Sequence, residues 1–182
     1  MAGLTLHGDL DHPATLTVAD LRKWPGHRAE VTFDCATNGP QHHVFEGVLL
    51  RDVVTRACPD LDGRRRKDRS RFLPAVSGGD GHHTVLSWAE LDADFCDGPV
   101  LPATRLDGED LDEAGYQPVV PSDRCGARYV SAVTHIWFGA LPVPVAVGAV
   151  GAVGPAPVGA FGAAVRSRPG GLTPFGGRPR ST

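Results

Sequence analysis

The amino-acid sequence predicts an α+β (mixed α/β) domain of many short strands and a few short helices over residues 1–140, followed by a disordered tail over residues 141–182. Three observations lead to this prediction. Short segments alternate apolar and polar residues, as half-buried strands do, and clusters of Gly, Pro, Asn or Asp separate them. Two Ser/Thr-x-x-acid patterns mark the starts of short helices. The last 41 residues contain seven Pro and nine Gly without hydrophobic periodicity, which is typical of a disordered segment.

The first half of the domain is predicted to contain three strands and two helices. Alternation places the strands at residues 4–8, 27–34 and 42–46, with a turn at 36–40. A short helix follows Thr17, which can cap it because Asp20 stands three residues on, and Pro25-Gly26 ends it. Apolar residues recur at helical spacing over 48–58. The charged segment 61–71 predicts an exposed, solvated connection.

The second half is predicted to be richer in strands. They lie at residues 72–77, 82–86, 100–105, 116–121 and 129–137, and the last two flank a loop over 122–126. Asp80-Gly81 indicates a turn in which Gly81 takes a positive φ. Ser87 caps a single helical turn, since Glu90 follows three residues later. His135 lies on an apolar strand, which favours a histidine in the core.

Charge and hydropathy exclude several classes of protein. The chain has a net charge of −3, and its first 141 residues carry 14 basic and 21 acidic side chains, which argues against a general nucleic-acid binder. No basic segment followed by an apolar run opens the chain, so a cytoplasmic location is expected. The apolar stretch 141–165 contains four prolines, so we expect no membrane span. The oligomeric state is left open.

Four cysteines are present, at positions 35, 58, 96 and 125, and none forms a Cys-x-x-Cys pair. A structural zinc site is therefore not predicted, and free, mostly buried thiols are expected. A metal-dependent hydrolase built from His42 and His82 with nearby acids is a third functional hypothesis, but no His-Glu-x-x-His spacing supports it. No Gly-x-Ser-x-Gly nucleophile motif is present either.

Five collinear motifs carry a family resemblance that spans roughly residues 3–139. They are Phe33-Asp-Cys-Ala-Thr-Asn-Gly39 with Phe45–Val54, Ser77–His82 with Leu86–Leu91, Leu106-Asp-Gly108, Val119-Val-Pro121, and Gly126–Ile136. Together they resemble the molybdopterin-binding oxidoreductase domain of the sulfite oxidase and methionine sulfoxide reductase catalytic-subunit superfamily. The resemblance implies the sulfite-oxidase-type molybdopterin-binding fold.

The same resemblance implies a function and a site. Cys35 stands where the family's cysteine supplies a thiolate to molybdenum, so it is the predicted metal ligand and catalytic residue. Thiolate is a soft ligand, and a metal keeps it deprotonated. The implied cofactor is molybdenum-molybdopterin, with oxo transfer at the metal, a small-molecule substrate and an electron-transfer partner. The predicted cofactor-binding residues are Asn38, His42, Asp80, Gly81, His82, Arg124, Gly126 and Arg128.

Two positions depart from the family pattern. Gln117 stands where a basic residue helps to hold the pterin phosphate, and Ser131 stands where a lysine contacts the cofactor. An anionic phosphate requires charged or backbone N–H donors. The alternative hypothesis is therefore a non-catalytic binding or scaffold module of the same fold that has lost the cofactor. For Arg124 and Arg128, the alternative to anion binding is a salt bridge on an acidic surface.

Overall fold

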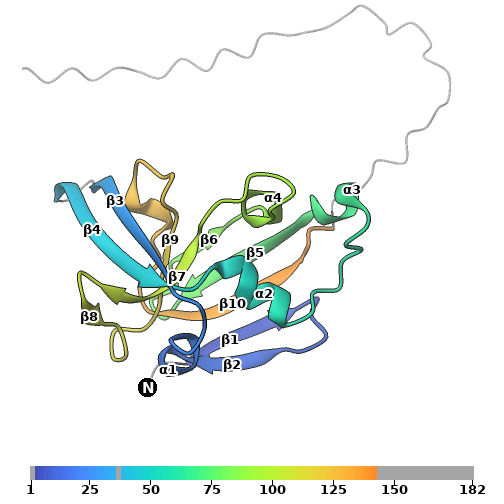
Figure 1. Ribbon diagram of the computed structural model, residues 1–182, viewed down its shortest axis with the longest axis horizontal. Helices are drawn as coiled ribbons and strands as arrows, with labels where there is room; N and C mark the ends of the chain where they lie inside the picture. Colours follow the sequence, from blue (N-terminus) through green and yellow to red (C-terminus); the bar gives the residue numbers. More distant parts are fainter. Residues whose placement is uncertain (1–2, 36–37, 143–182) are drawn as a thin grey trace, which may run out of the picture. The chain divides into compact units, whose positions relative to one another are not determined.

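The computed structural model describes residues 3–35 and 38–142, which form two five-stranded sheets joined by short helices (Figure 1). The first sheet has the order β2-β1-β10-β5-β6, and β1 and β10 are its parallel pair. Its strands are β1 (Gly3–Gly8), β2 (Ala14–Thr17), β5 (Phe72–Gly78), β6 (His83–Val85) and β10 (Val133–Ala140).

The second sheet is antiparallel, with the order β3-β4-β7-β8 and with β9 also paired to β7. Its strands are β3 (His27–Cys35), β4 (Gly39–Gly47), β7 (Leu101–Leu106), β8 (Glu109–Asp110) and β9 (Gln117–Val119). The long β3–β4 hairpin extends away from the other strands in the view of Figure 1. Its tip carries Cys35, whose register partner is Gly39.

The helices are short, and local sequence explains where they begin. They are α1 (Val18–Leu21), α2 (Leu50–Arg56), α3 (Arg66–Arg69), α4 (Trp88–Leu91) and the 3₁₀ turn η1 (Gly126–Arg128). Both predicted capping boxes are present, at Thr17 with Asp20 and at Ser87 with Glu90. Each box satisfies backbone N–H groups that a first turn leaves without partners.

A single core joins the two sheets. It combines alternate residues of β1 and β10 with buried residues of β4 and β7 and with the apolar face of α2. This face holds Val53 and Val54, as the helical spacing predicted. The predicted mixed, strand-rich fold is confirmed. Of the predicted tail at 141–182, residues 143–182 lie outside the described residues, so the domain boundary stays a prediction.

Three local predictions are wrong. The connection 61–71 is not wholly solvated, because it contains α3 and Arg69 is 9% exposed. His135 is exposed rather than in the core, because the alternation of β10 turns Ile136 and Phe138 inward instead. The last strand begins at Val133, since η1 and the positive φ of Ala132 precede it.

The cysteine prediction is confirmed in one respect and wrong in another. All four thiols are free, as the sequence predicted. None of them is buried, however: Cys58, Cys96 and Cys125 are exposed and Cys35 is half-buried. Three of the four lie in loops or at a helix end rather than on the core face of a strand, which is why packing does not cover them.

Candidate functional site

The end of β3 and the loop before η1 are held side by side. The Asp34 backbone N–H donates to the Arg124 carbonyl at 2.9 Å, and Asp34 and Cys125 form an isolated parallel bridge. This contact joins segments that are about ninety residues apart in the sequence. It places Cys35 beside the Cys125–Gly126 peptide, and these residues line one pocket.

A pocket of about 340 Å³ opens at this junction. Its lining residues are Phe33, Asp34, Cys35, Gln117, Cys125, Gly126, Ala127 and Tyr129. The lining contains two thiols, one amide and one carboxylate, and no Lys or Arg. Of the predicted site residues, Cys35 and Gly126 line it directly. Cys35 is half-buried there, so its thiol is accessible to a ligand in the pocket.

Gly126 is required by a close approach of an aromatic ring. A Cβ atom at this position would lie 2.7 Å from Cε2 of Phe33, so any larger residue would push the ring aside. Phe33 also packs edge-on against Tyr129, with their ring centroids 4.8 Å apart. The Tyr129 hydroxyl donates to the Val120 carbonyl at 3.0 Å. Burial raises the pKa of Tyr129 to about 12, so the phenol stays protonated near neutrality.

The Asp80–His82 turn lies at the edge of the pocket. Gly81 has a φ of 85°, as predicted for this turn, and the His82 backbone N–H donates to Asp80 Oδ1 at 2.9 Å. The His82 Nε2 atom lies 3.1 Å from the Ala127 carbonyl, so this nitrogen carries the hydrogen. The turn is thereby tied to a pocket-lining residue. None of the three predicted residues of this loop lines the pocket, and His82 is the one that contacts a lining residue.

Arg128 is already occupied by two carboxylates. Its Nε and Nη2 atoms donate to Asp123 at 2.8 and 2.5 Å, and its Nη1 donates to Glu90 Oε1 at 3.0 Å. Hydrogen bonding to Asp123, opposed by partial burial and assisted by Glu90, raises the pKa of Arg128 above its usual value. Within the described chain, its charge is balanced before any ligand arrives. Arg128 therefore forms salt bridges with acidic side chains, which is the alternative to anion binding given in the sequence analysis.

Arg124 differs from Arg128. It is exposed, and no carboxylate of the described residues lies within 4 Å of its guanidinium group. Its backbone carbonyl is fixed by the Asp34 N–H, one residue before Cys35. Arg124 is therefore the predicted cation that remains available near the pocket.

Two of the predicted residues on the β3–β4 hairpin do not line the pocket. His42 pairs with Thr32, whereas Phe33 pairs with Gln41, so His42 lies on the face opposite to Phe33 and Cys35. Its Nε2 lies 3.1 Å from Glu30 Oε1 on that exposed face. This position does not suit the role predicted for His42. Asn38 is exposed in the turn, and its carbonyl accepts from the Gln41 side chain at 3.2 Å.

His43 is the histidine that shares the face of Phe33, and sequence reasoning did not single it out. Its ring lies 5.9 Å from the Phe33 ring, and its Nδ1 is 2.7 Å from Asp107 Oδ2. The alternation of a strand shows that only one residue of the pair 42–43 can face the pocket side. Which of the two does so depends on the pairing of β3 with β4.

The described residues contain no group of three or more His, Cys, Asp or Glu side chains arranged to hold a metal ion. The metal-dependent hydrolase hypothesis therefore has no ligand set in this part of the chain. A single thiolate such as Cys35 holds a metal only where a cofactor supplies the other ligands. Within the same residues, no helix is long and apolar enough to cross a membrane.

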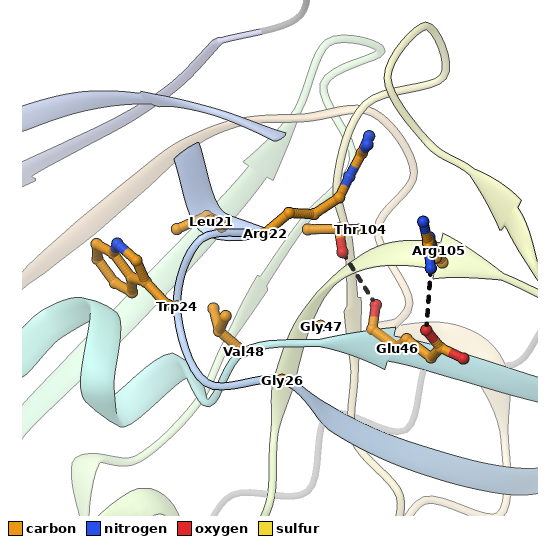
Figure 2. A pocket seen from close by; sticks show the side chains of 9 residues that line it. All are labelled: Leu21, Arg22, Trp24, Gly26, Glu46, Gly47, Val48, Thr104 and Arg105. Carbon is orange, nitrogen blue, oxygen red and sulfur yellow. Dashed lines mark hydrogen bonds and ion pairs between the residues drawn. The ribbon is translucent and has the colours of Figure 1, made fainter. Parts of the chain in front are cut away.

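A second hollow, of about 190 Å³, lies between the end of α1 and the strands β4 and β7 (Figure 2). Figure 2 shows Thr104 and Arg105 facing Glu46, with the Thr104 hydroxyl 3.4 Å from the Glu46 carbonyl. Arg105 pairs with Glu46 and Asp110, and Arg22 pairs with Asp110 and Asp112. The cations here are balanced, and no predicted site residue lines this hollow.

Comparison with known proteins finds a matching family model and similar solved structures. A family model described as the oxidoreductase molybdopterin binding domain matches residues 3–142. Among solved structures, the sulfane dehydrogenase SoxCD from Paracoccus pantotrophus is similar, with a TM-score of 0.60 and 19% identity over 78% of this chain. The match covers 39% of the SoxCD chain, and at this identity it shows the fold alone. A search of curated proteins finds no match.

Proposed function

Because the chain belongs to the oxidoreductase molybdopterin binding domain family, we propose that it holds a molybdenum-molybdopterin group with Cys35 as the protein ligand and acts as an oxidoreductase. The observation that carries the proposal is the half-buried Cys35 thiol at a pocket of which six of the eight lining residues belong to the family motifs. When bound, such a group supplies oxo-transfer chemistry at molybdenum, while the protein supplies binding and orientation.

The residues suit this group at its metal end. Cys35 is the last residue of β3, and the end of this strand has backbone contacts on both sides. On one side Cys35 pairs with Gly39, and on the other the Asp34 N–H donates to the Arg124 carbonyl. A thiolate fixed by backbone contacts on both sides loses little freedom when it binds a soft metal. Phe33 and Tyr129 form an apolar wall beside it, which limits the access of water.

The anionic end is held by fewer cations than the family pattern supplies. Arg124 can reach a phosphate as an unpaired guanidinium, and the Gln117 side chain can donate from the pocket wall. Arg128 supports the loop through Asp123 rather than donating to a ligand. A small-molecule substrate and an electron-transfer partner complete the proposal.

Metal and pterin content tests this proposal directly. The full chain would be produced in a host that makes molybdopterin, and molybdenum and pterin fluorescence would be measured per protein. We expect near-stoichiometric molybdenum in the parent chain, its loss in Cys35→Ser, and its retention in the matched control Cys96→Ser, whose thiol is exposed in a loop. Folded parent protein with neither molybdenum nor pterin would contradict the proposal.

A specific observation favours a second candidate, a non-catalytic binding module of the same fold. Arg128 is consumed by Asp123 and Glu90, and Gln117 and Ser131 are neutral. On this hypothesis Cys35→Ser leaves both folding and biological activity intact. Loss of the biological activity in that variant, with an unchanged melting temperature, would count against it.

A further inference from the structure

The segment from Gly63 to Arg71 contains the densest group of cations in the chain. Arg64, Arg65, Arg66, Lys67, Arg69 and Arg71 surround a single acid, Asp68. The one-turn helix α3 forms within it, on the side of the molecule away from the β3–β4 hairpin (Figure 1). Arg69 fixes this segment to the body, so the backbone that carries the other cations is constrained.

Arg69 anchors the segment. Its Nη1 donates to the buried Asp92 at 2.6 Å, its Nη2 donates to Asp94, and its guanidinium carbon lies 5.5 Å from the centre of the Phe95 ring. The side chain of Arg69 is 11% exposed and that of Asp92 is 8% exposed. This buried pair holds α3 beside the end of α4. Because both carboxylates pair with Arg69, its charge is not available to a ligand, and its role is structural.

The other cations around the hollow are not paired with carboxylates in the same way. Within the described residues, Arg64, Arg65 and Lys67 have no carboxylate within 4 Å, and Arg66 approaches Asp94 only at 3.8 Å. These four side chains, with Gly63, Arg69 and Asp94, line an open hollow of about 610 Å³. Three unpaired positive charges therefore surround one concave surface.

The acids in and around the segment already have partners within it. Asp62 Oδ1 accepts the backbone N–H of Arg64, and Asp68 accepts both the backbone N–H of Asp62 and the Nε of Arg71. Asp94 is held by the anchoring Arg69. The carboxylates thus stabilise the loop itself, and the unpaired guanidinium and ammonium groups remain directed to solvent.

We propose that this hollow binds the phosphate chain of a compact multivalent anion, a pyrophosphate-type group. Guanidinium groups match phosphate oxygens in pairs, and a lysine adds a point charge. A compact anion is favoured over an extended one, because the first 141 residues have an excess of seven acids and would repel a polymer beyond the hollow. The site is distinct from the Cys35 pocket and does not depend on the function proposed above.

An adjoining hollow bears on the source of the phosphate chain. It has a volume of about 360 Å³ and shares Gly63 and Arg69 with the basic one. Its acids, Asp52 and Asp92, pair with Arg51 and Arg69, and its other lining residues include Thr55, Leu61 and Trp88. Apolar and hydroxyl groups of this kind suit the organic part of a nucleotide. Inorganic pyrophosphate would use the basic hollow alone, whereas a nucleoside diphosphate would use both.

Calorimetric titration of the full chain with inorganic pyrophosphate and with ADP tests the site. The test variant is Arg65→Ala with Lys67→Ala, and the matched control is Lys23→Ala with Arg28→Ala, which removes the same charges from exposed surface pairs. We expect saturable binding of pyrophosphate that is about tenfold or more weaker in the test variant, as the loss of one charge-assisted hydrogen bond implies, and unchanged in the control.

Comparison of the two ligands shows whether the phosphate chain is that of inorganic pyrophosphate or of a nucleotide. ADP binding more tightly than pyrophosphate would support a nucleotide, and equal binding would support the phosphate chain alone. Absence of saturable binding of both ligands would overturn the proposal. Equal weakening in the test and control variants would overturn it too, because it would show only the response of any protein to a change in net charge.

Discussion

The Cys35 pocket and the basic hollow at α3 use arginine in opposite ways. Beside the pocket, Arg128 is held by Asp123 and Glu90, and no cation lines the wall. At α3, Arg69 is held by Asp92 and Asp94, and this pairing leaves Arg64, Arg65 and Lys67 at the surface of a concave site. Whether a cation is available to a ligand depends on the carboxylates that the fold brings to it.

The largest expected effect follows from replacing Arg69, the buried arginine that anchors α3. Arg69→Met leaves the Asp92 side chain, which is 8% exposed, buried without its cation. We expect the free energy of unfolding to fall by about 3 kcal/mol, because removing one partner of a buried pair leaves an uncompensated charge. Urea denaturation followed by circular dichroism measures this loss.

A matched control for that variant lies two residues away. Arg71 pairs with Asp68 at 2.8 Å on the surface, so Arg71→Ala should cost less than about 1 kcal/mol. An equally small loss in Arg69→Met would show that the segment is not anchored. The constraint on the basic hollow would then be lost.

A smaller effect is expected at the pocket. Arg128→Met removes the hydrogen bonds to Asp123 and Glu90 and should lower the free energy of unfolding by about 1 kcal/mol, since the side chain is partly exposed. Cofactor content per folded protein should stay unchanged, because Arg128 is engaged elsewhere. Arg124→Ala should have the reverse effects, with normal stability and reduced cofactor content. A large loss of cofactor in Arg128→Met would show that Arg128 exchanges its carboxylates for the ligand.

The smallest expected effect is on how the stability of the protein depends on pH, and it arises at Asp94, a carboxylate that pairs with Arg69. The hydrogen bond from Arg69 holds the pKa of Asp94 below its usual value in the folded protein. The folded state therefore binds fewer protons than the unfolded state, and this stabilisation is present above the ordinary carboxyl pKa of about 4 and lost as the pH falls below it. The urea midpoint should fall less between neutral and acid pH in Asp94→Asn than in the parent chain. Identical acid losses in the two proteins would contradict this account.

Several elements of the fold and of the site could be predicted because their causes are local. Thr17 with Asp20 and Ser87 with Glu90 cap helices through neighbours three residues away, and Asp80-Gly81 forms its turn through the φ of one glycine. Cys35 and Gly126 could be placed at the pocket only because the order of the motifs resembles a known family. Composition and periodicity did not place them there.

The burial and the ion-pair partners of the charged residues could not be predicted from neighbouring residues. Arg69 and Arg66 stand three residues apart in one basic run, yet the first is buried against Asp92 and the second is exposed. Arg128 meets Glu90 from 38 residues away, and the pairing of β3 with β4 puts His43 rather than His42 on the face of Phe33. No local pattern contains this information, because electrostatic pairing depends on distances across the folded chain.

The sequence by itself determined a strand-rich domain with short capped helices, an acidic net charge and a family cysteine at the end of a strand, because each of these follows from neighbouring residues or from motif order. Only the tertiary structure decided which cations remain available and which side chains meet at the pocket. The reason is physical: a side chain acquires its burial and its partners from segments that are remote in sequence, and those contacts exist only once the two sheets have closed on one core.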